Sequence, residues 1–493
     1  MELKIKLLKW SAGIPVAMLN KETAAKVGIH ANERISVKTT SRNPKEVTTI
    51  VDIVEKIVNK NELAVSSELK KRLGLKVGQK VEINIESSPE SVTFVKKKLN
   101  GKKLSKKEIN DIIKDIVNNA LSGPEVALFI SAMYKYGMDN QETIYLTEAI
   151  ANSGNRLNLK GKFIVDKHSI GGIPGNRTTP IVISICAATG LTMPKTSSRA
   201  ITTPAGTADV METIAQVEFS IPELKKILEK TNACLVWGGA LGLVPADSKI
   251  IETEKMLNID PEAQLLASIM AKKIAVGSKY ILIDIPYGKT AKVDEKKALR
   301  LKRKFQFLGK HFNKKIKIVL TKGDEPMGSG IGPVLEMIDV IRVLDPKQKG
   351  PRDLEEKSLF LSGEILELTG KAKKSKGRLM AEQILDSGNA FEKFKQIVKA
   401  QKGHLNNLKP GKFKHKIVSN KKGKIVEINN KKISSLARVA GCPIDKSAGL
   451  YIHFNVGETF EANDTILTIY AESKSRLRQA VRFYKKVKPI VTK

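Results

Sequence analysis

Side chains able to bind an anion are concentrated in one short stretch, which we name the first anion segment (residues 166–177). It places Lys167 beside His168 and Ser169, and three glycines follow, Gly171, Gly172 and Gly175. Glycines leave backbone N–H groups free to face a ligand, and a lysine supplies the opposite charge. Glycine clusters also form tight turns that bind nothing, but the adjoining lysine, histidine and serine favour the anion site. The expected ligand is phosphate.

The residues on either side give this segment its setting. Phe163–Val165 is an apolar run that predicts a buried strand. Thr179 can cap a helix, and Pro180 can occupy its first turn. The predicted unit is therefore a strand, a glycine-rich basic loop and a helix N-terminus whose dipole attracts anions.

A second anion segment (residues 195–209) follows shortly afterwards. Six hydroxyl-bearing residues lie between Thr196 and Thr207, with Arg199 among them. Thr207 can cap a helix that starts at Ala208. Taken alone, the segment is equally well explained as a polar surface loop. Two such segments in succession favour a ligand that carries phosphate at two places.

Other polar residues are ambiguous when taken by themselves. Asp260 stands before Pro261 and Glu262, which is an ordinary helix start. Ser268 and Lys272 have the spacing of a solvated pair on one helix face. The glycine-rich run 327–333 lacks the spacing of a dinucleotide fingerprint, so it predicts a tight turn into a helix.

Composition narrows the class of ligand. The 493 residues include 86 Lys and Arg against 51 Asp and Glu, a net charge of +35. Such a charge favours nucleic acid, an anionic membrane surface or phosphorylated metabolites, although a lysine-rich hyperthermophile surface explains it equally well. The basic residues are spread along the chain and aromatic residues make up 5%, which argues against surfaces that stack bases.

Cysteine usage and hydropathy indicate in which cellular compartment the protein is expected. The three cysteines form no paired motif, so neither a zinc site nor a disulfide framework is indicated. The sequence has no apolar run of membrane-spanning length and no signal peptide at Met1. We expect a soluble cytoplasmic protein.

Periodicity predicts a multidomain α/β protein. Short alternating runs and the similar phrases at 25–28 and 73–78 predict an internally duplicated small barrel at the N-terminus, resembling the double-psi barrels of archaeal proteins. Helical spacing follows, then alternating strands and helices with a largely parallel sheet. The lysine- and glycine-rich stretch 370–411 is expected to be a surface segment or a junction. The expected domains are an N-terminal double-psi-like β-barrel (1–86), a small α-helical lobe (93–155 and 245–275), a large α/β phosphate-binding lobe (160–244 and 276–410) and a C-terminal β-rich α+β domain (411–493).

The two anion segments together resemble the signature loops of the thymidine phosphorylase family, the pyrimidine-nucleoside phosphorylases. The amino-acid sequence from Ser197 to Asp209 and the additional N-terminal barrel resemble the archaeal branch of this family. The resemblance covers essentially the whole chain. It implies a pentosyltransferase in which phosphate attacks C1′ of a nucleoside 5′-monophosphate. AMP would be the expected best substrate, with CMP and UMP also plausible, and ribose 1,5-bisphosphate the product. No cofactor is implied, because phosphate is a co-substrate and no metal-ligand cluster is present.

The resemblance also implies roles for particular residues. Asp260 would give a proton to the leaving base. The attacking phosphate would be held by Lys167, Ser169, Thr179, Ser197 and Thr207. The nucleotide would be bound by Gly172, Ser198, Arg199, Ala200, Ile201, Thr202, Thr203, Thr207, Ser268 and Lys292. His168 and Lys272 are possible contacts of the base.

Three other readings compete with this one. A pyrimidine-nucleoside phosphorylase needs no 5′-phosphate site, and thymidine would be its substrate. A phosphoribosyltransferase of related fold would depend on magnesium. A nucleic-acid binder would account for the charge, but the basic runs contain no interleaved aromatic residues, so we expect no specific nucleic acid and no membrane as partner. The family resemblance implies a homodimer or a larger homo-oligomer.

Overall fold

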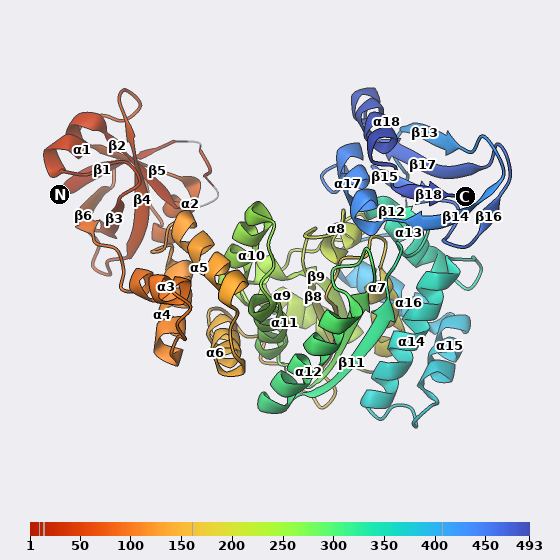
Figure 1. Cartoon of the computed structure of the whole chain (residues 1–493). Coiled ribbons are helices and arrows are strands. Elements are labelled where there is room, and N and C mark those ends of the chain that lie inside the picture. Colours follow the sequence, from red (N-terminus) through yellow and green to blue (C-terminus); the bar gives the residue numbers. More distant parts are fainter. Residues whose placement is uncertain (9, 13–14, 160, 407) are drawn as a thin grey trace. The chain divides into compact units, whose positions relative to one another are not determined.

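The computed structural model describes residues 1–8, 10–12, 15–159, 161–406 and 408–493 (Figure 1). Within these ranges the chain forms two compact units. The first unit contains residues 1–154 and 244–271, and the second contains residues 155–243 and 272–493. No helix among the described residues is both long and apolar enough to cross a membrane.

The first unit begins with a closed six-stranded barrel in the order β1-β5-β2-β4-β3-β6. The barrel has an internal symmetry. If β1, β2 and β3 are exchanged with β4, β5 and β6, respectively, the strand order and the direction of every strand pair stay the same, as expected for a duplicated sequence. The two similar segments, 25–28 and 73–78, lie at the C-terminal ends of helices α1 and α2, where Gly28 and Gly74 adopt the left-handed conformation. The elements are β1 (Glu2–Leu7), β2 (Val16–Asn20), α1 (Lys21–Val27), β3 (Arg34–Thr39), β4 (Glu46–Val54), β5 (Glu62–Val65), α2 (Ser67–Leu73) and β6 (Lys80–Glu86).

Helices make up the rest of the first unit. The capping box predicted by Ser105 and Glu108 is confirmed at the start of α4, since each side chain accepts from the other's backbone N–H. Arg34 of the barrel forms an ion pair with Glu125 of α5, which attaches the barrel to this helical part. The helices are α3 (Ser91–Leu99), α4 (Lys106–Asn118), α5 (Gly123–Tyr136), α6 (Asn140–Ala151), α10 (Pro245–Leu257) and α11 (Glu262–Val276), the last belonging to this unit up to Ala271.

The second unit is built on parallel strands, as the alternating pattern predicted. Strands β11-β10-β7 form one parallel sheet and β8-β9 another, and a parallel bridge between Ile164 and Thr192 places β8 beside β7. All five strands therefore end at the same edge. They are β7 (Val165–Ser169), β8 (Met193–Ser197), β9 (Ala233–Trp237), β10 (Tyr280–Tyr287) and β11 (Lys315–Lys322).

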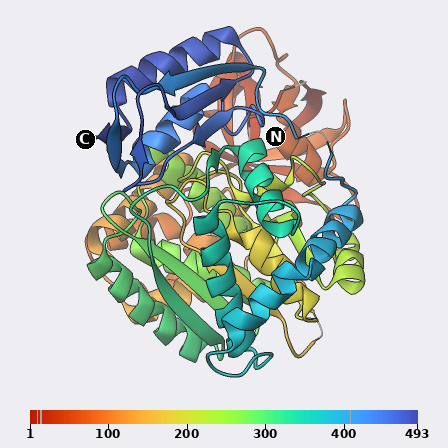
Figure 2. The same cartoon turned by 90° about the vertical axis from the view of Figure 1, so that its right-hand side faces the viewer.

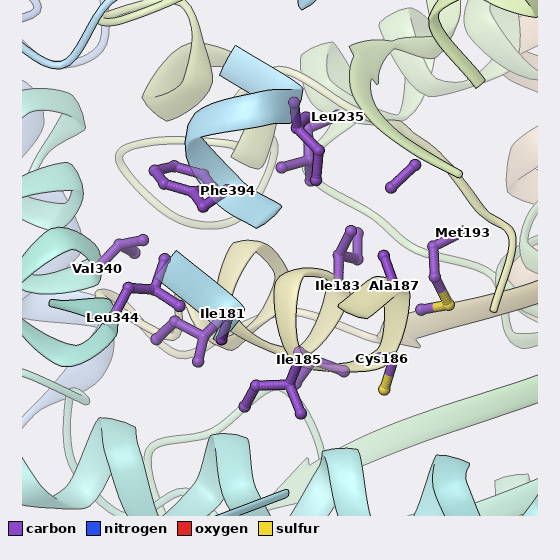
Figure 3. Close-up of a cluster of buried hydrophobic side chains, with 14 of the residues drawn as sticks. Ile181, Ile183, Ile185, Cys186, Ala187, Met193, Leu235, Val340, Leu344 and Phe394 are labelled. Atoms are coloured by element: carbon purple, nitrogen blue, oxygen red, sulfur yellow. The ribbon is translucent and has the colours of Figure 1, made fainter. Parts of the chain in front are cut away.

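Helices enclose a large apolar core beside these strands. Figure 3 shows Ile181 and Ile185 of α7 in one cluster with Leu344 of α13 and Phe394 of α16. The helices are α7 (Thr178–Ala188), α8 (Thr207–Met211), α9 (Ile221–Thr231), the 3-10 helix η1 (Gly238–Leu241), α12 (Glu295–His311), α13 (Pro333–Leu344), α14 (Arg352–Leu368), α15 (Gly377–Asp386) and α16 (Asn389–Ala400).

The prediction of a surface segment over 370–411 is wrong for most of that stretch. It forms α15 and α16, and Leu385, Phe394 and Ile397 are buried in the main core. Helix α15 contains no lysine and α16 contains three, and most lysines of the stretch lie outside both helices, so the overall composition concealed the helical spacing of the apolar residues.

The C-terminal part is β-rich, as predicted, and shares a sheet with the α/β part. Strand β12 (Gly330–Ile331), which follows the glycine-rich turn, pairs with β15, so the sheet order is β12-β15-β17-β13. A second sheet has the order β16-β14-β18. Figure 2 shows this part, in blue, seated on the α/β part, in green and cyan. Its elements are β13 (Phe413–Val418), β14 (Gly423–Ile428), α17 (Asn430–Ala440), β15 (Gly449–Ile452), β16 (Thr459–Phe460), β17 (Thr465–Ala471), α18 (Lys474–Val487) and β18 (Ile490–Thr492).

Candidate active site

The first anion segment lies at the carboxyl end of the central strand β7, the edge of a parallel sheet at which ligands bind. Asp166 and Lys167 are in the strand rather than in a loop, because β7 runs to Ser169. The expected strand Phe163–Val165 is thus displaced toward the C-terminus. An isolated buried charge is costly, but Asp166 is not isolated.

Asp166 lies between two buried lysines. Its Oδ2 is 2.8 Å from Nζ of Lys273 and its Oδ1 is 3.3 Å from Nζ of Lys195. Lys195 also donates to the backbone carbonyl of Lys167, at 2.7 Å. Burial lowers the pKa of Lys273 to about 7. Lys273 is not among the predicted site residues, and its only signal in the sequence is its position beside Lys272.

Lys167 is the buried cation that faces the start of α7. Its Nζ is 2.8 Å from Oγ1 of Thr178 and 3.2 Å from Oγ1 of Thr179. Burial lowers the pKa of Lys167 to about 7. The expected cap is wrong: Arg177 occupies the N-cap position and Thr179 lies inside the first turn. An ammonium group, two hydroxyls and a helix N-terminus therefore meet at one point, and Thr178 is a further polar residue there.

Arg177 connects the first anion segment with the second. Its Nε is 2.5 Å from Oε2 of Glu336, and its two terminal nitrogens donate to Thr207 Oγ1 at 3.1 Å and to the carbonyl of Ala205 at 2.9 Å. Glu336 is fully buried, and burial raises its pKa even beside Arg177. This bridging role was not foreseen, although Arg177 belongs to the segment that first indicated an anion site.

Two glycines let the predicted nucleotide residues approach one another. Gly172 has φ +92°, and a Cβ there would lie 2.7 Å from Cβ of Lys292. Gly171 has φ +83°, and a Cβ there would lie 3.2 Å from Oγ1 of Thr202. Larger residues at these positions would be both strained and crowded. The structure thus brings Gly172 together with Lys292, and the second anion segment against the first.

The second anion segment folds around one carboxylate. Asp209 accepts from the backbone N–H of Ala200 at 2.7 Å and of Gly206 at 2.8 Å. Gly206 is the N-cap of α8 and Thr207 is its first residue, so the predicted cap at Thr207 is wrong. In and beside the stretch between these anchors, Ser198 and Thr202 are exposed, whereas Ala200, Ile201, Thr203 and Thr207 are half-buried.

Arg199 is already engaged with acidic side chains. Its guanidinium forms two bonds with the Glu212 carboxylate, at 2.8 and 2.9 Å, and lies 4.8 Å from the centre of the Trp237 ring. The Glu212 hydrogen bond is the largest of the effects that raise the pKa of Arg199. Arg199 therefore fixes the conformation of the second anion segment and also gives it a positive charge.

Three buried polar atoms at the ends of β7 and β8 have no hydrogen-bond partner among the described residues. They are His168 Nδ1, Thr196 Oγ1 and Ser197 Oγ. Burial and the nearby lysines, Lys273 first, hold the pKa of His168 well below its usual value, so the ring is neutral. Buried polar atoms usually have partners, so these atoms are candidates for ligand contacts. Lys272, half-buried in α11, also contributes to the lowered pKa of His168.

The remaining predicted residues belong to the first unit. Asp260 is half-buried in the turn between α10 and α11, and Ser268 is buried in α11. The roles of Asp260 and Ser268 follow from the family resemblance.

Family models match three parts of the chain between residues 92 and 490. Residues 92–154 match the glycosyl transferase family helical bundle domain, residues 161–391 match its a/b domain, and residues 424–490 match the pyrimidine nucleoside phosphorylase C-terminal domain. The fold also resembles the crystal structure of anthranilate phosphoribosyltransferase from Thermus thermophilus, with a TM-score of 0.52 and 17% identity over 62% of this chain and 99% of that one.

Curated relatives match from end to end. The AMP phosphorylase of Pyrococcus furiosus is 42% identical over 99% of this chain and 97% of its own length. That of Thermococcus sibiricus is 41% identical, with the same coverage. The AMP phosphorylase of Methanococcoides burtonii is 39% identical over 100% of this chain and 97% of its own.

Proposed function

Because the chain belongs to the AMP phosphorylase family, we propose that it catalyses the phosphorolysis of AMP, yielding adenine and α-D-ribose 1,5-bisphosphate. The observation that carries this proposal is the buried Lys167 ammonium, which meets two threonine hydroxyls at the N-terminus of α7. This is the chemistry of a phosphate site, and it lies at the ligand-binding edge of the sheet.

The phosphate site uses residues from both anion segments. Lys167 supplies the charge, and its ammonium bonds the oxygen of Thr179, which leaves the hydrogen of that hydroxyl free to donate to phosphate. Thr207 is placed in the same way, since its oxygen accepts from Arg177. Ser169 and Ser197 end the two neighbouring strands and complete the predicted set.

The nucleotide is assigned to the second anion segment and its neighbours. Contact residues in this assignment are Gly172, Ser198, Arg199, Ala200, Ile201, Thr202, Thr203, Thr207, Ser268 and Lys292, with His168 and Lys272 at the base. The contact between Gly172 and Lys292 and the neutral state of His168 support this assignment. A neutral imidazole can both donate and accept a hydrogen bond with a nucleobase.

The reaction is a substitution at C1′ of the ribose. A phosphate oxygen forms the new bond to C1′ as the bond to the base nitrogen breaks, and the base leaves with the electron pair. Asp260 gives a proton to that base, which removes the developing negative charge. A positioned general acid of this kind contributes about 10²–10⁴-fold in rate. No cofactor takes part in the proposed reaction.

Finer parts of the proposal concern substrates and assembly. CMP and UMP are further substrates, and the reaction belongs to nucleotide salvage or degradation in the cytoplasm. The protein works as a homodimer or larger homo-oligomer without a specific nucleic-acid partner. The exchange of halves that leaves the barrel order unchanged supports a double-psi barrel.

A chromatographic assay tests the proposed reaction. The purified protein is incubated with AMP with and without phosphate, and adenine and sugar phosphate are separated. We expect adenine release that depends on phosphate and yields one ribose bisphosphate for each adenine. Release of base from thymidine or uridine, but not from AMP, would instead identify a pyrimidine-nucleoside phosphorylase, the activity named by the matched C-terminal domain.

The role of Asp260 is tested by the variant Asp260→Asn. We expect kcat for AMP to fall by about 10²-fold or more with little change in KM, because the amide cannot give up a proton. The neighbouring variant Glu262→Gln on the first turn of α11 is the matched control. Near-normal activity in Asp260→Asn would remove Asp260 from the mechanism.

A further inference from the structure

Helix α17 of the C-terminal part makes contacts with the predicted nucleotide-binding residues that the proposed reaction does not explain. The exposed Arg438 of this helix donates from one terminal nitrogen to the carbonyls of Ile201, at 2.7 Å, and Thr203, at 3.3 Å. These two carbonyls flank Thr202, whose hydroxyl faces Gly171 of the first anion segment. Arg438 thus fixes the exposed middle of the second anion segment from outside the α/β part.

The first turn of α17 binds a second group of residues beside the predicted nucleotide site. The fully buried Asn430 donates from its side-chain nitrogen to Thr290 Oγ1 and to the carbonyl of Gly323, both at 2.9 Å. Thr290 stands two residues before Lys292, which lies against Gly172. The same helix therefore positions the turn that carries Lys292.

A third contact comes from the chain that follows α17. Nζ of Lys446 is 2.9 Å from Oε2 of Glu212, the carboxylate that binds Arg199 with two hydrogen bonds. All three contacts end on groups that shape the predicted nucleotide site, and none ends on Lys167 or on the threonines beside it. They act in addition to contacts elsewhere, such as the pairing of β12 with β15, that attach the C-terminal part to the α/β part.

We propose that Arg438 is a positioning residue for nucleotide binding, which holds residues 201–203 in the conformation that receives the nucleotide. The proposal rests on the proposed function, because it assigns the second anion segment to AMP. Asn430 and Lys446 support the same arrangement. Residues 198–206 form neither helix nor strand, so side-chain contacts must fix their conformation.

The test compares Arg438→Ala with wild type in steady-state kinetics. We expect KM for AMP to rise about tenfold, as expected for loss of a charged hydrogen bond. The value of kcat should stay within about twofold and KM for phosphate should not change, because the contacts of Lys167 are untouched. Arg438→Lys keeps a donor of the same charge and should recover part of the affinity for AMP. Arg478→Ala on the exposed face of α18 is the matched control and should behave as wild type.

Hydrogen exchange of the peptide covering residues 199–206 gives a readout that does not depend on activity. The backbone N–H groups of Ala200 and Gly206 are bonded to Asp209 and should exchange faster in Arg438→Ala than in wild type or Arg478→Ala. Unchanged KM for AMP together with unchanged exchange would overturn the proposal. Equal rises in both KM values, or a general increase in exchange across the second unit, would also overturn it, because Arg438 would then serve stability alone. Failure of wild type to release adenine from AMP would refute the proposed function, and the exchange measurement would still decide whether Arg438 orders this segment.

Discussion

The first and second anion segments are fixed by different means. The first is anchored inside the α/β part, where Asp166 lies between two buried lysines and Lys167 is enclosed with two threonines. The second is half-exposed, and its anchors are the carboxylates of Asp209 and Glu212 together with Arg438 of the C-terminal part. The proposed phosphate site is therefore held by buried contacts within the α/β part, and the proposed nucleotide segment beside it is held partly by the C-terminal part.

The physical contrast lies in the surroundings of the charges. A buried ion pair is held strongly because removing one partner leaves a charge without solvent or counter-ion. A half-exposed pair is screened by water and contributes little to stability. Changes in the first segment should therefore affect folding and phosphate binding, and changes in residues 198–206 of the second should affect nucleotide binding alone.

The largest expected effect is that of Asp166→Asn on stability. It should lower the free energy of unfolding by about 3–5 kcal/mol, because Lys195 and Lys273 would remain buried without a counter-charge. In a Trp10→Phe background, urea unfolding followed by the fluorescence of Trp237 reports on the second unit. The matched carboxylate-to-amide change at Glu212, which binds Arg199 of the second segment, is Glu212→Gln, and it should cost less than about 1 kcal/mol. Similar losses in the two variants would contradict the contrast between the segments.

Replacement of Lys167 by Met should lower kcat/KM for phosphate by about 10²–10³-fold, the usual cost of removing one preorganised donor from a charged site. Initial rates at varied phosphate and saturating AMP measure this. The exposed Lys279→Met is the control for loss of a lysine in the same unit. If Lys167→Met instead lowered the affinity for AMP and left phosphate binding intact, the first segment would bind the nucleotide and the proposed assignment would be wrong.

Anion affinity should depend on pH through Lys167. Burial lowers its pKa to about 7, so the ammonium loses its proton as the pH rises above 7 and its attraction for an anion falls. Sulfate does not titrate in this range, so its inhibition constant against phosphate should rise by up to about tenfold for each pH unit between pH 7 and 9. The variant Lys167→Met should lack this slope. A constant inhibition constant in wild type would show that Lys167 keeps its charge.

The smallest expected effect is that of Arg199→Lys. A lysine cannot form the two-point contact with Glu212, so the second segment loosens and KM for AMP should rise about threefold. KM for phosphate should stay the same. Steady-state kinetics with each substrate varied in turn separates the two, and an increase confined to phosphate would count against the division of roles.

Much of the architecture could be predicted from local patterns. Apolar runs identified β10 and β11, and the Ser105–Glu108 spacing identified the start of α4, because short-range rules govern these features. The same rules failed where tertiary contacts dominate. Thr179 and Thr207 were expected to be helix caps, yet α7 and α8 are capped by Arg177 and Gly206.

In the candidate site, the sequence likewise predicted which types of residue take part, but it did not predict which residues bind one another. The composition of the two anion segments indicated phosphate chemistry, and the apolar run Phe163–Val165 predicted that the first of them follows a buried strand. Only the folded chain shows that Asp166 binds Lys273 instead of ending in a loop, and that Arg438 reaches Ile201 across 237 positions of sequence. Local sequence fixes which groups are available, because spacing and propensity act over a few residues. Strand pairing and core packing decide which of these groups meet, because they depend on the path of the whole chain.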